Sequence, residues 1–190
     1  YTDGQGVKYE LSSDNWGNAT AKVVSVETSS YPKKIVIPEK VSEIYTVTEI
    51  ESSVFSTCYE LVSVTIPKTM KTIGYNAFNG CNKLYEVYDL REEKKSDNSC
   101  LGSYAKDIYE TEDKPSKIIE YEGFYFYVNG EEIELLAYNG DDKTITTPES
   151  YKGNKYKIAN YAFYGSGATN IVISEGATSI GDHAFYHRQS

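Results

Sequence analysis

The chain has 190 residues, of which 39% are hydrophobic and 25% are charged, and its formal net charge is -9 at pH 7. This composition is typical of a globular protein and excludes intrinsic disorder as the main state. The negative charge argues against nucleic acid or an anionic membrane as a partner, because both require a basic surface. No apolar run approaches the roughly 20 residues that cross a bilayer, so we expect no membrane insertion. The first residues lack the basic and apolar regions of a signal peptide, so we expect a mature or trimmed fragment.

The N-terminal part of the chain predicts a β-hairpin followed by further strands. In VKYELSSDNWGNATAKVVSV (7–26), two strand-like runs flank a turn-forming centre. In KIVIPEKVSEIYTVTEI (34–50), a short apolar run ends in Pro-Glu and a second run leads into the next part of the chain. We interpret the hairpin as a lead-in to the repeats that follow.

A short phrase then recurs along the chain, as TEIESSVFSTC (48–58), TIGYNAFNGC (72–81) and TSIGDHAFYHR (178–188). A constant offset is typical of stacked repeats, in which one coil is too small to bury its own apolar residues. We therefore predict that equivalent side chains lie one above another in a shared core. The pairs that share one constant offset are Ile50 and Ile73, Phe55 and Phe78, Cys58 and Cys81, Leu61 and Leu84, and Val64 and Val87. A third copy, whose period is shorter by a single position, contains Ile158, Phe163, Ala168, Ile171, Ile173, Ile180 and Phe185.

Each repeat combines a strand with a return leg. LVSVTIP (61–67) alternates as a strand does, so Leu61, Val64 and Ile66 are expected inside and Ser63 and Thr65 on the open face. In the return leg, IGYNAFNG (73–80), Gly and Asn surround a Phe. This pattern predicts a short helical turn that carries the chain back across the other side of the coil with the Phe buried.

The same plan recurs in the second half of the chain. GFYFYVNGEEIELLAYNG (123–140) predicts a hairpin that turns at Asn129-Gly130, and TITTPESYKGNKYKI (144–158) resembles 34–50. We therefore predict a first module over 1–91, a polar loop or linker insert over 92–118, and a second module over 119–190. Within the insert, SYAKDIY (103–109) suggests a short helix. Asp89 takes the place of Ile66, and a buried unpaired carboxylate is costly, so the strand is expected to stop or bulge there.

These residues resemble the BspA-type leucine-rich repeat, whose units read approximately as Ile-Gly, Ala-Phe, Cys, Leu and a strand ending in Ile-Pro. TIGYNAFNGCNKL (72–84) and TSIGDHAF (178–185) match that pattern, and SVTIPKT (63–69) supplies the Ile-Pro. The resemblance implies an α/β, β-rich leucine-rich-repeat solenoid of 22–23-residue coils with β-hairpin lead-ins and an interrupting insert. The sequence departs from the family pattern at Glu51, Val54 and Ser174, and we expect these departures to weaken individual coils. Members are typically secreted or surface-displayed proteins of mucosal bacteria and some protists, and several resemble adhesins that engage host proteins.

The sequence offers little for catalysis or metal binding, and we expect no enzyme activity and no cofactor. Cys58 and Cys81 occupy equivalent positions in consecutive coils, so either a ladder of buried thiols or a disulfide fits the spacing. Cys100 lies in a polar segment with no neighbouring base. His183 and His187 are spaced i, i+4, but no further ligand joins them, so no metal site is expected.

The outward face of the repeat strands is the candidate binding face. Its residues alternate with the core positions of the strands, and exposed aromatic side chains such as Tyr88 are enriched at protein contacts. We expect the chain to be a recognition or adhesion module that binds an extracellular host or envelope protein through this face. Two alternatives are a carbohydrate-binding module, suggested by Tyr121, Tyr125, Tyr127 and Tyr138 among 19 tyrosines, and a structural spacer for another domain. The candidate face consists of Lys34, Val36, Ser63, Thr65, Glu86, Tyr88, Asn170 and Val172.

Overall fold

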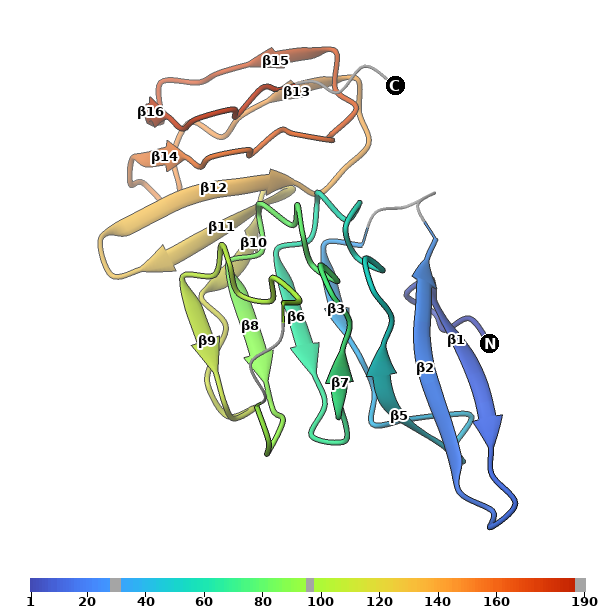
Figure 1. Cartoon of the computed structure of the whole chain (residues 1–190). Coiled ribbons are helices and arrows are strands. Elements are labelled where there is room, and N and C mark those ends of the chain that lie inside the picture. Colours follow the sequence, from blue (N-terminus) through green and yellow to red (C-terminus); the bar gives the residue numbers. More distant parts are fainter. Residues whose placement is uncertain (28–31, 95–97, 187–190) are drawn as a thin grey trace. The chain divides into compact units, whose positions relative to one another are not determined.

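The computed structural model describes residues 1–27, 32–94 and 98–186, which fall into two compact units (Figure 1). Unit 1 is Tyr1–Lys114 and unit 2 is Pro115–Ser190. Within the described ranges, the secondary structure consists of strands and turns, with no helix.

Two sheets form unit 1, and successive coils contribute a strand to each. The first, which we call the hairpin sheet, begins with the predicted hairpin, whose second strand runs parallel to the first coil strand. Its strands are β1 (Val7–Ser13), β2 (Ala19–Val26), β5 (Tyr45–Ile50), β7 (Thr72–Ile73) and β4 (Lys40–Val41). The second, the repeat sheet, is parallel throughout and contains β3 (Lys34–Val36), β6 (Ser63–Ile66), β8 (Glu86–Asp89) and β9 (Asp107–Tyr109).

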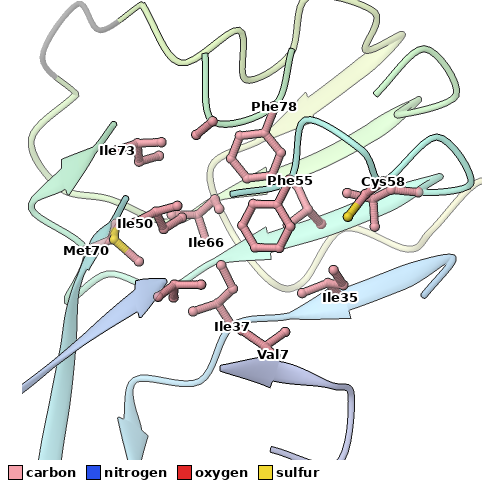
Figure 2. Close-up of a cluster of buried hydrophobic side chains, with 14 of the residues drawn as sticks. Val7, Ile35, Ile37, Ile50, Phe55, Cys58, Ile66, Met70, Ile73 and Phe78 are labelled. Atoms are coloured by element: carbon pink, nitrogen blue, oxygen red, sulfur yellow. The ribbon is translucent and has the colours of Figure 1, made fainter. Parts of the chain in front are cut away.

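The core of unit 1 lies between these two sheets and contains the predicted ladders. Ile50 pairs with Ile73 in the hairpin sheet, and Val64 pairs with Val87 in the repeat sheet. Phe55 stacks on Phe78, the equivalent residue of the next coil. Figure 2 shows both rings together with the surrounding aliphatic side chains. All of these residues are buried. The constant spacing of the repeats thus predicted the packing of the core correctly.

The return legs are successions of tight turns rather than helical segments. In the second coil, the amides of Ala77, Asn79 and Cys81 each donate to the carbonyl three residues earlier. Intervening amides donate to the next coil instead, as Phe78 does to the Ser99 carbonyl at 2.8 Å. The predicted helical turn does not form, because the backbone donors are shared between turns and neighbouring coils.

Asp89 ends β8 without distorting it. Of the two expected outcomes, the strand stops at Asp89 and does not bulge, because it keeps its register with β6 through the pairing of Ile66 with Asp89. The carboxylate is buried and forms two contacts with Arg91, Nε to Oδ1 at 2.8 Å and Nη2 to Oδ2 at 2.9 Å. A bidentate arginine supplies the partner that a buried carboxylate requires.

The repeat sheet continues into the segment that was expected to be a polar insert. Glu86 pairs with Asp107 and Tyr88 with Tyr109, which makes β9 the fourth strand. The prediction of a short helix over 103–109 is therefore wrong. Without β9, the backbone donors and acceptors of β8 on that side would lack partners, and a strand satisfies them whereas a helix would not.

Unit 2 repeats the plan of unit 1 with fewer coils. Its hairpin turns at Gly130, which has φ of 63°. The second hairpin strand, β12 (Glu132–Tyr138), then pairs in parallel with β14 (Tyr156–Ile158), as β2 does with β5. Phe163 and Phe185 stack with ring centroids 5.4 Å apart. One sheet contains β10 (Ile118–Tyr121), β11 (Phe124–Asn129), β12 (Glu132–Tyr138), β14 (Tyr156–Ile158) and β16 (Ala177–Ile180). The other contains β13 (Thr144–Thr146) and β15 (Asn170–Val172).

Candidate binding face of the repeat sheet

Two rows of side chains cross the outer face of the repeat sheet, which is the face turned away from the core. Strand alternation places them there, because the residues between them are core residues. The register aligns Lys34, Ser63 and Glu86 in one row and Val36, Thr65 and Tyr88 in the other. The six predicted residues of unit 1 are thus neighbours on one sheet.

Exposure decreases across this face from β3 towards β8. Lys34 is exposed and Val36 is 56% exposed, whereas Ser63 and Thr65 are half-buried. Glu86 is completely buried, so its prediction as an open surface residue is wrong. Alternation determines the direction in which a side chain points but not whether other parts of the chain cover it. The accessible part of the face is therefore its β3–β6 side.

Tyr88 is held in place rather than free in solvent. Its hydroxyl donates to the Lys114 carbonyl at 3.2 Å, and its ring lies 4.9 Å from the Tyr109 ring. Burial raises the pKa of Tyr109 to about 12, and the charges of Asp107 and Glu86 add to this effect. The two tyrosines form a fixed aromatic pair on β8 and β9.

Asp107 and Tyr109 extend the two rows, although neither residue was predicted from the sequence. A signal for them exists, since Glu86-Val87-Tyr88 and Asp107-Ile108-Tyr109 share an acidic, aliphatic and Tyr triplet. The second triplet comes earlier than the period of the coils would place it, and a charged stretch separates it from the first.

A side chain closes the β3 edge of the sheet. The side-chain nitrogen of Gln5, Nε2, donates to the Val36 carbonyl at 2.8 Å. The backbone amide of Val36 donates to Gln5 Oε1, also at 2.8 Å. The glutamine thereby takes the place of a neighbouring strand at this residue.

Buried charges support the sheet at the start of its strands. Glu60 and Lys83 occupy equivalent positions in consecutive coils and form a salt bridge, with Lys33 Nζ 3.9 Å from the same carboxylate. Both members of the pair are buried. Burial lowers the pKa of Lys83, and the contact with Glu60 opposes that shift. The Glu60–Lys83 pair joins two consecutive coils just before β6 and β8 begin, and Lys33 is its partly exposed neighbour.

The two candidate residues of unit 2 belong to a different sheet. Asn170 pairs with Thr144 and Val172 pairs with Thr146, and both candidates are exposed. The eight predicted residues are therefore divided between the repeat sheet and the β13–β15 sheet.

The tyrosines proposed for carbohydrate binding contribute mainly to packing. Tyr127 is only 2% exposed, so it is not available to a glycan. Tyr121 packs edge-on against Phe126, and Tyr138 lies with its ring 5.0 Å from Phe124. Tyr121, Tyr125 and Tyr138 are half-buried, and the rings of Tyr121 and Tyr138 thus take part in aromatic packing within unit 2.

The cysteines follow the buried-thiol alternative. Cys58 and Cys81 are buried free thiols, and Cys81 Sγ donates to the Phe55 carbonyl at 3.2 Å. His183 stacks on Tyr161 with ring centroids 5.3 Å apart, and His187 lies outside the described residues. In the described ranges, no group of three or more His, Cys, Asp or Glu side chains could hold a metal ion. The same residues contain no helix that is long and apolar enough to cross a membrane.

A known family of repeat proteins matches the pattern of the coils. A family model described as a BspA type Leucine rich repeat region matches residues 27–135 and 156–190. A leucine rich cell surface protein from Faecalibacterium prausnitzii is 17% identical, with 97% of this chain and 73% of that chain covered and a TM-score of 0.37. The T. pallidum Leucine Rich Repeat protein is 16% identical, with 97% and 87% covered and a TM-score of 0.39. No curated protein matches the chain. Since the family model covers well over half of the residues, the chain belongs to the BspA-type leucine-rich repeat family.

Proposed function

We propose that this chain is a non-enzymatic recognition or adhesion module that binds an extracellular host or envelope protein. The contact surface is the accessible part of the repeat sheet, formed by Lys34, Val36, Ser63 and Thr65. The observation that carries the proposal is the in-register alignment of these residues on two adjacent parallel strands.

The composition of this surface suits a protein partner. Val36 offers exposed apolar area on the same face of β3 as Lys34, and two small hydroxyl side chains continue the surface on β6. The core packs against the inner side of these strands, and the Glu60–Lys83 salt bridge joins the coils just before β6 and β8 begin. Binding to such a preformed surface requires little ordering of the backbone.

Family membership supports a location outside the cell, because members are typically secreted or displayed at the surface. We propose the same location for this chain. A leucine-rich coil that carries its binding residues on a rigid sheet is well suited to contact another macromolecule there.

The test is a binding measurement against immobilised extracellular proteins, including fibronectin and fibrinogen. Thr65→Lys and Val36→Glu each place a long charged side chain on the surface and should weaken binding at least about tenfold. Tyr75→Ala is the control, because Tyr75 is 62% exposed but lies on a return leg. Each variant should retain the denaturant midpoint of the parent chain. Failure to bind any protein in a broad panel, or equal binding by all three variants, would contradict the proposal.

A further inference from the structure

The turn between β1 and β2 presents the single tryptophan of the chain to solvent. Trp16 is 90% exposed, more than any other large hydrophobic side chain in the described part of the chain. All residues from 12 to 18 are exposed, so nothing shields the indole ring. A tryptophan normally buries much of its area, which makes this placement unusual.

A dense set of hydrogen bonds orders the turn. The Gly17 amide donates to the Asp14 carbonyl at 3.2 Å, and the Asp14 amide donates to the Asn18 carbonyl at 3.1 Å. Asp14 Oδ1 accepts from the amides of Trp16 at 2.9 Å and Asn18 at 2.8 Å, and Oδ2 accepts from the Asn18 side chain at 2.7 Å. Gly17 has φ of 81°, a conformation that glycine adopts without strain. The ring therefore projects from a backbone that is already in place.

The residues around Trp16 in the turn are polar, and Asp14 is the one charged residue among residues 12–18. Ser13, Asn15 and Asn18, which neighbour Trp16 in the turn, are exposed polar residues, and the Asp14 carboxylate accepts three hydrogen bonds within the turn. Further down the hairpin, Lys22 lies 3.6 Å from Glu10, so these charges offset one another. Trp16 is the only exposed large hydrophobic side chain of residues 7–26. The tip is thus one flat apolar ring bordered by hydrogen-bonding groups.

We propose that the Asp14–Asn18 turn binds a neutral sugar residue of a glycan, with the sugar ring stacked on the Trp16 indole. A pyranose has one face of C–H groups and a rim of hydroxyls. The C–H face matches the indole, and the hydroxyl rim matches amides that both donate and accept hydrogen bonds. Acidic sugars are disfavoured by the net charge of -9. This site is separate from the repeat-sheet face and does not depend on it.

Two other partners fit the tip less well. A stable protein interface buries about 800 Å² on each side, whereas the tip offers the apolar area of a single ring on a narrow hairpin. A membrane surface accepts an indole, but one exposed aromatic side chain without basic neighbours provides little attraction. A single sugar residue, in contrast, is similar in size to the Trp16 indole ring.

The sole tryptophan makes the site directly observable. The labelled chain is first applied to an array of neutral glycans, and the glycans that bind are then titrated while the emission and acrylamide quenching of Trp16 are followed. The expected result is a shifted emission and reduced quenching at saturation. Trp16→Ala should weaken binding at least about tenfold, and Trp16→Tyr should restore part of it. Asp14→Ala retains the ring but loosens the turn, so it should weaken binding by less than Trp16→Ala does.

Tyr75→Ala is the matched control and should bind like the parent chain, because it removes an exposed aromatic ring elsewhere in unit 1. The proposal is overturned if no neutral glycan binds, or if a glycan binds equally well to Trp16→Ala. It is also overturned if phosphatidylcholine vesicles or an immobilised protein protect Trp16 from acrylamide and no glycan does. If the parent chain binds a neutral glycan but no extracellular protein, that result would contradict only the proposed binding by the repeat sheet.

Discussion

The rings of Phe55 and Phe78 lie nearly parallel, 11° apart, with centroids separated by 4.8 Å. Both side chains are fully buried, and each occupies the return leg of its own coil. The contact therefore links two consecutive coils through the segments that lead from the hairpin sheet to the repeat sheet. Such a stack is the unit from which the core of a repeat protein is built.

Truncation of one ring should distinguish the inside of a coil from its outside. Phe78→Ala leaves a cavity beneath Phe55 and should lower the free energy of unfolding by about 3 to 5 kcal/mol. Thr65→Ala, on the open face, should change it by no more than about 0.5 kcal/mol. Denaturant titration of both variants measures the difference, and similar losses would show that the two faces are misassigned.

Removal of the Lys83 ammonium should destabilise the fold more than its loss from a surface pair would. Lys83→Met leaves the Glu60 carboxylate buried, with Lys33 at 3.9 Å, and should cost about 3 to 5 kcal/mol of unfolding free energy. The double variant Glu60→Met/Lys83→Met should recover part of that loss, because no lone charge remains buried.

Lys68→Met is the control for this experiment, since Lys68 forms an exposed salt bridge with Glu39. Its effect on the denaturant midpoint should be small because solvent screens the pair. If the double variant were no more stable than Lys83→Met alone, the burial of the Glu60 charge would not be the cause of the loss.

The glycine of the Ile-Gly motif is required by the close approach of neighbouring coils. A Cβ atom on Gly74 would clash with the Ser52 amide nitrogen and would lie 2.7 Å from the Glu51 carbonyl carbon. Because these are backbone atoms, the coils must separate, and Gly74→Ala should cost about 1 to 3 kcal/mol. A Cβ atom on Gly4 would have no other atom within 4 Å, so Gly4→Ala should have a negligible effect. Denaturant titration of the two variants measures the difference in unfolding free energy.

Stability should fall in alkaline solution because buried acids resist ionisation. Burial raises the pKa of Cys58 from 9.0 to about 12 and that of Tyr109 from 10.0 to about 12. The folded state thus holds these protons more tightly than the unfolded state does, so the stabilisation is complete below the unfolded pKa values. It is lost as the pH rises from those values towards 12.

Denaturant titrations between about pH 8 and pH 11 measure this loss. The variant Cys58→Ala/Tyr109→Phe should show a shallower decrease of the unfolding free energy with pH. An equal slope for the variant and the parent chain would assign the alkaline loss to other groups.

The core of the coils could be predicted from the sequence because one constant offset relates the apolar pairs from Ile50 to Val87. Stacking follows when each coil has the same length. The strand β9 was not predicted, because the triplet Asp107-Ile108-Tyr109 follows Glu86-Val87-Tyr88 at a shorter spacing than that offset. A charged segment also separates the two triplets. The pairing of Arg91 with Asp89 was not predicted either. Arg91 lies in a loop outside the repeat pattern, so the spacing of the repeats gives no information on its position.

The candidate face was harder to predict than the fold. The register that aligns Lys34 with Ser63 follows from alternation, which is a local property. The burial of Glu86 depends on which parts of the chain pack over it, and a repeat pattern contains no information on that packing. The exposure of Trp16 likewise depends on the absence of neighbours at a hairpin tip rather than on a motif.

The bonds between Gln5 and Val36 have a consequence for the behaviour of the chain at high concentration. An uncovered strand edge is a template on which a second molecule can add its own strand, and such additions lead to aggregation. At β3 the donor and the acceptor of Val36 are both already engaged by one side chain. A foreign strand would have to displace that glutamine first, so this margin of the sheet resists the growth of intermolecular assemblies.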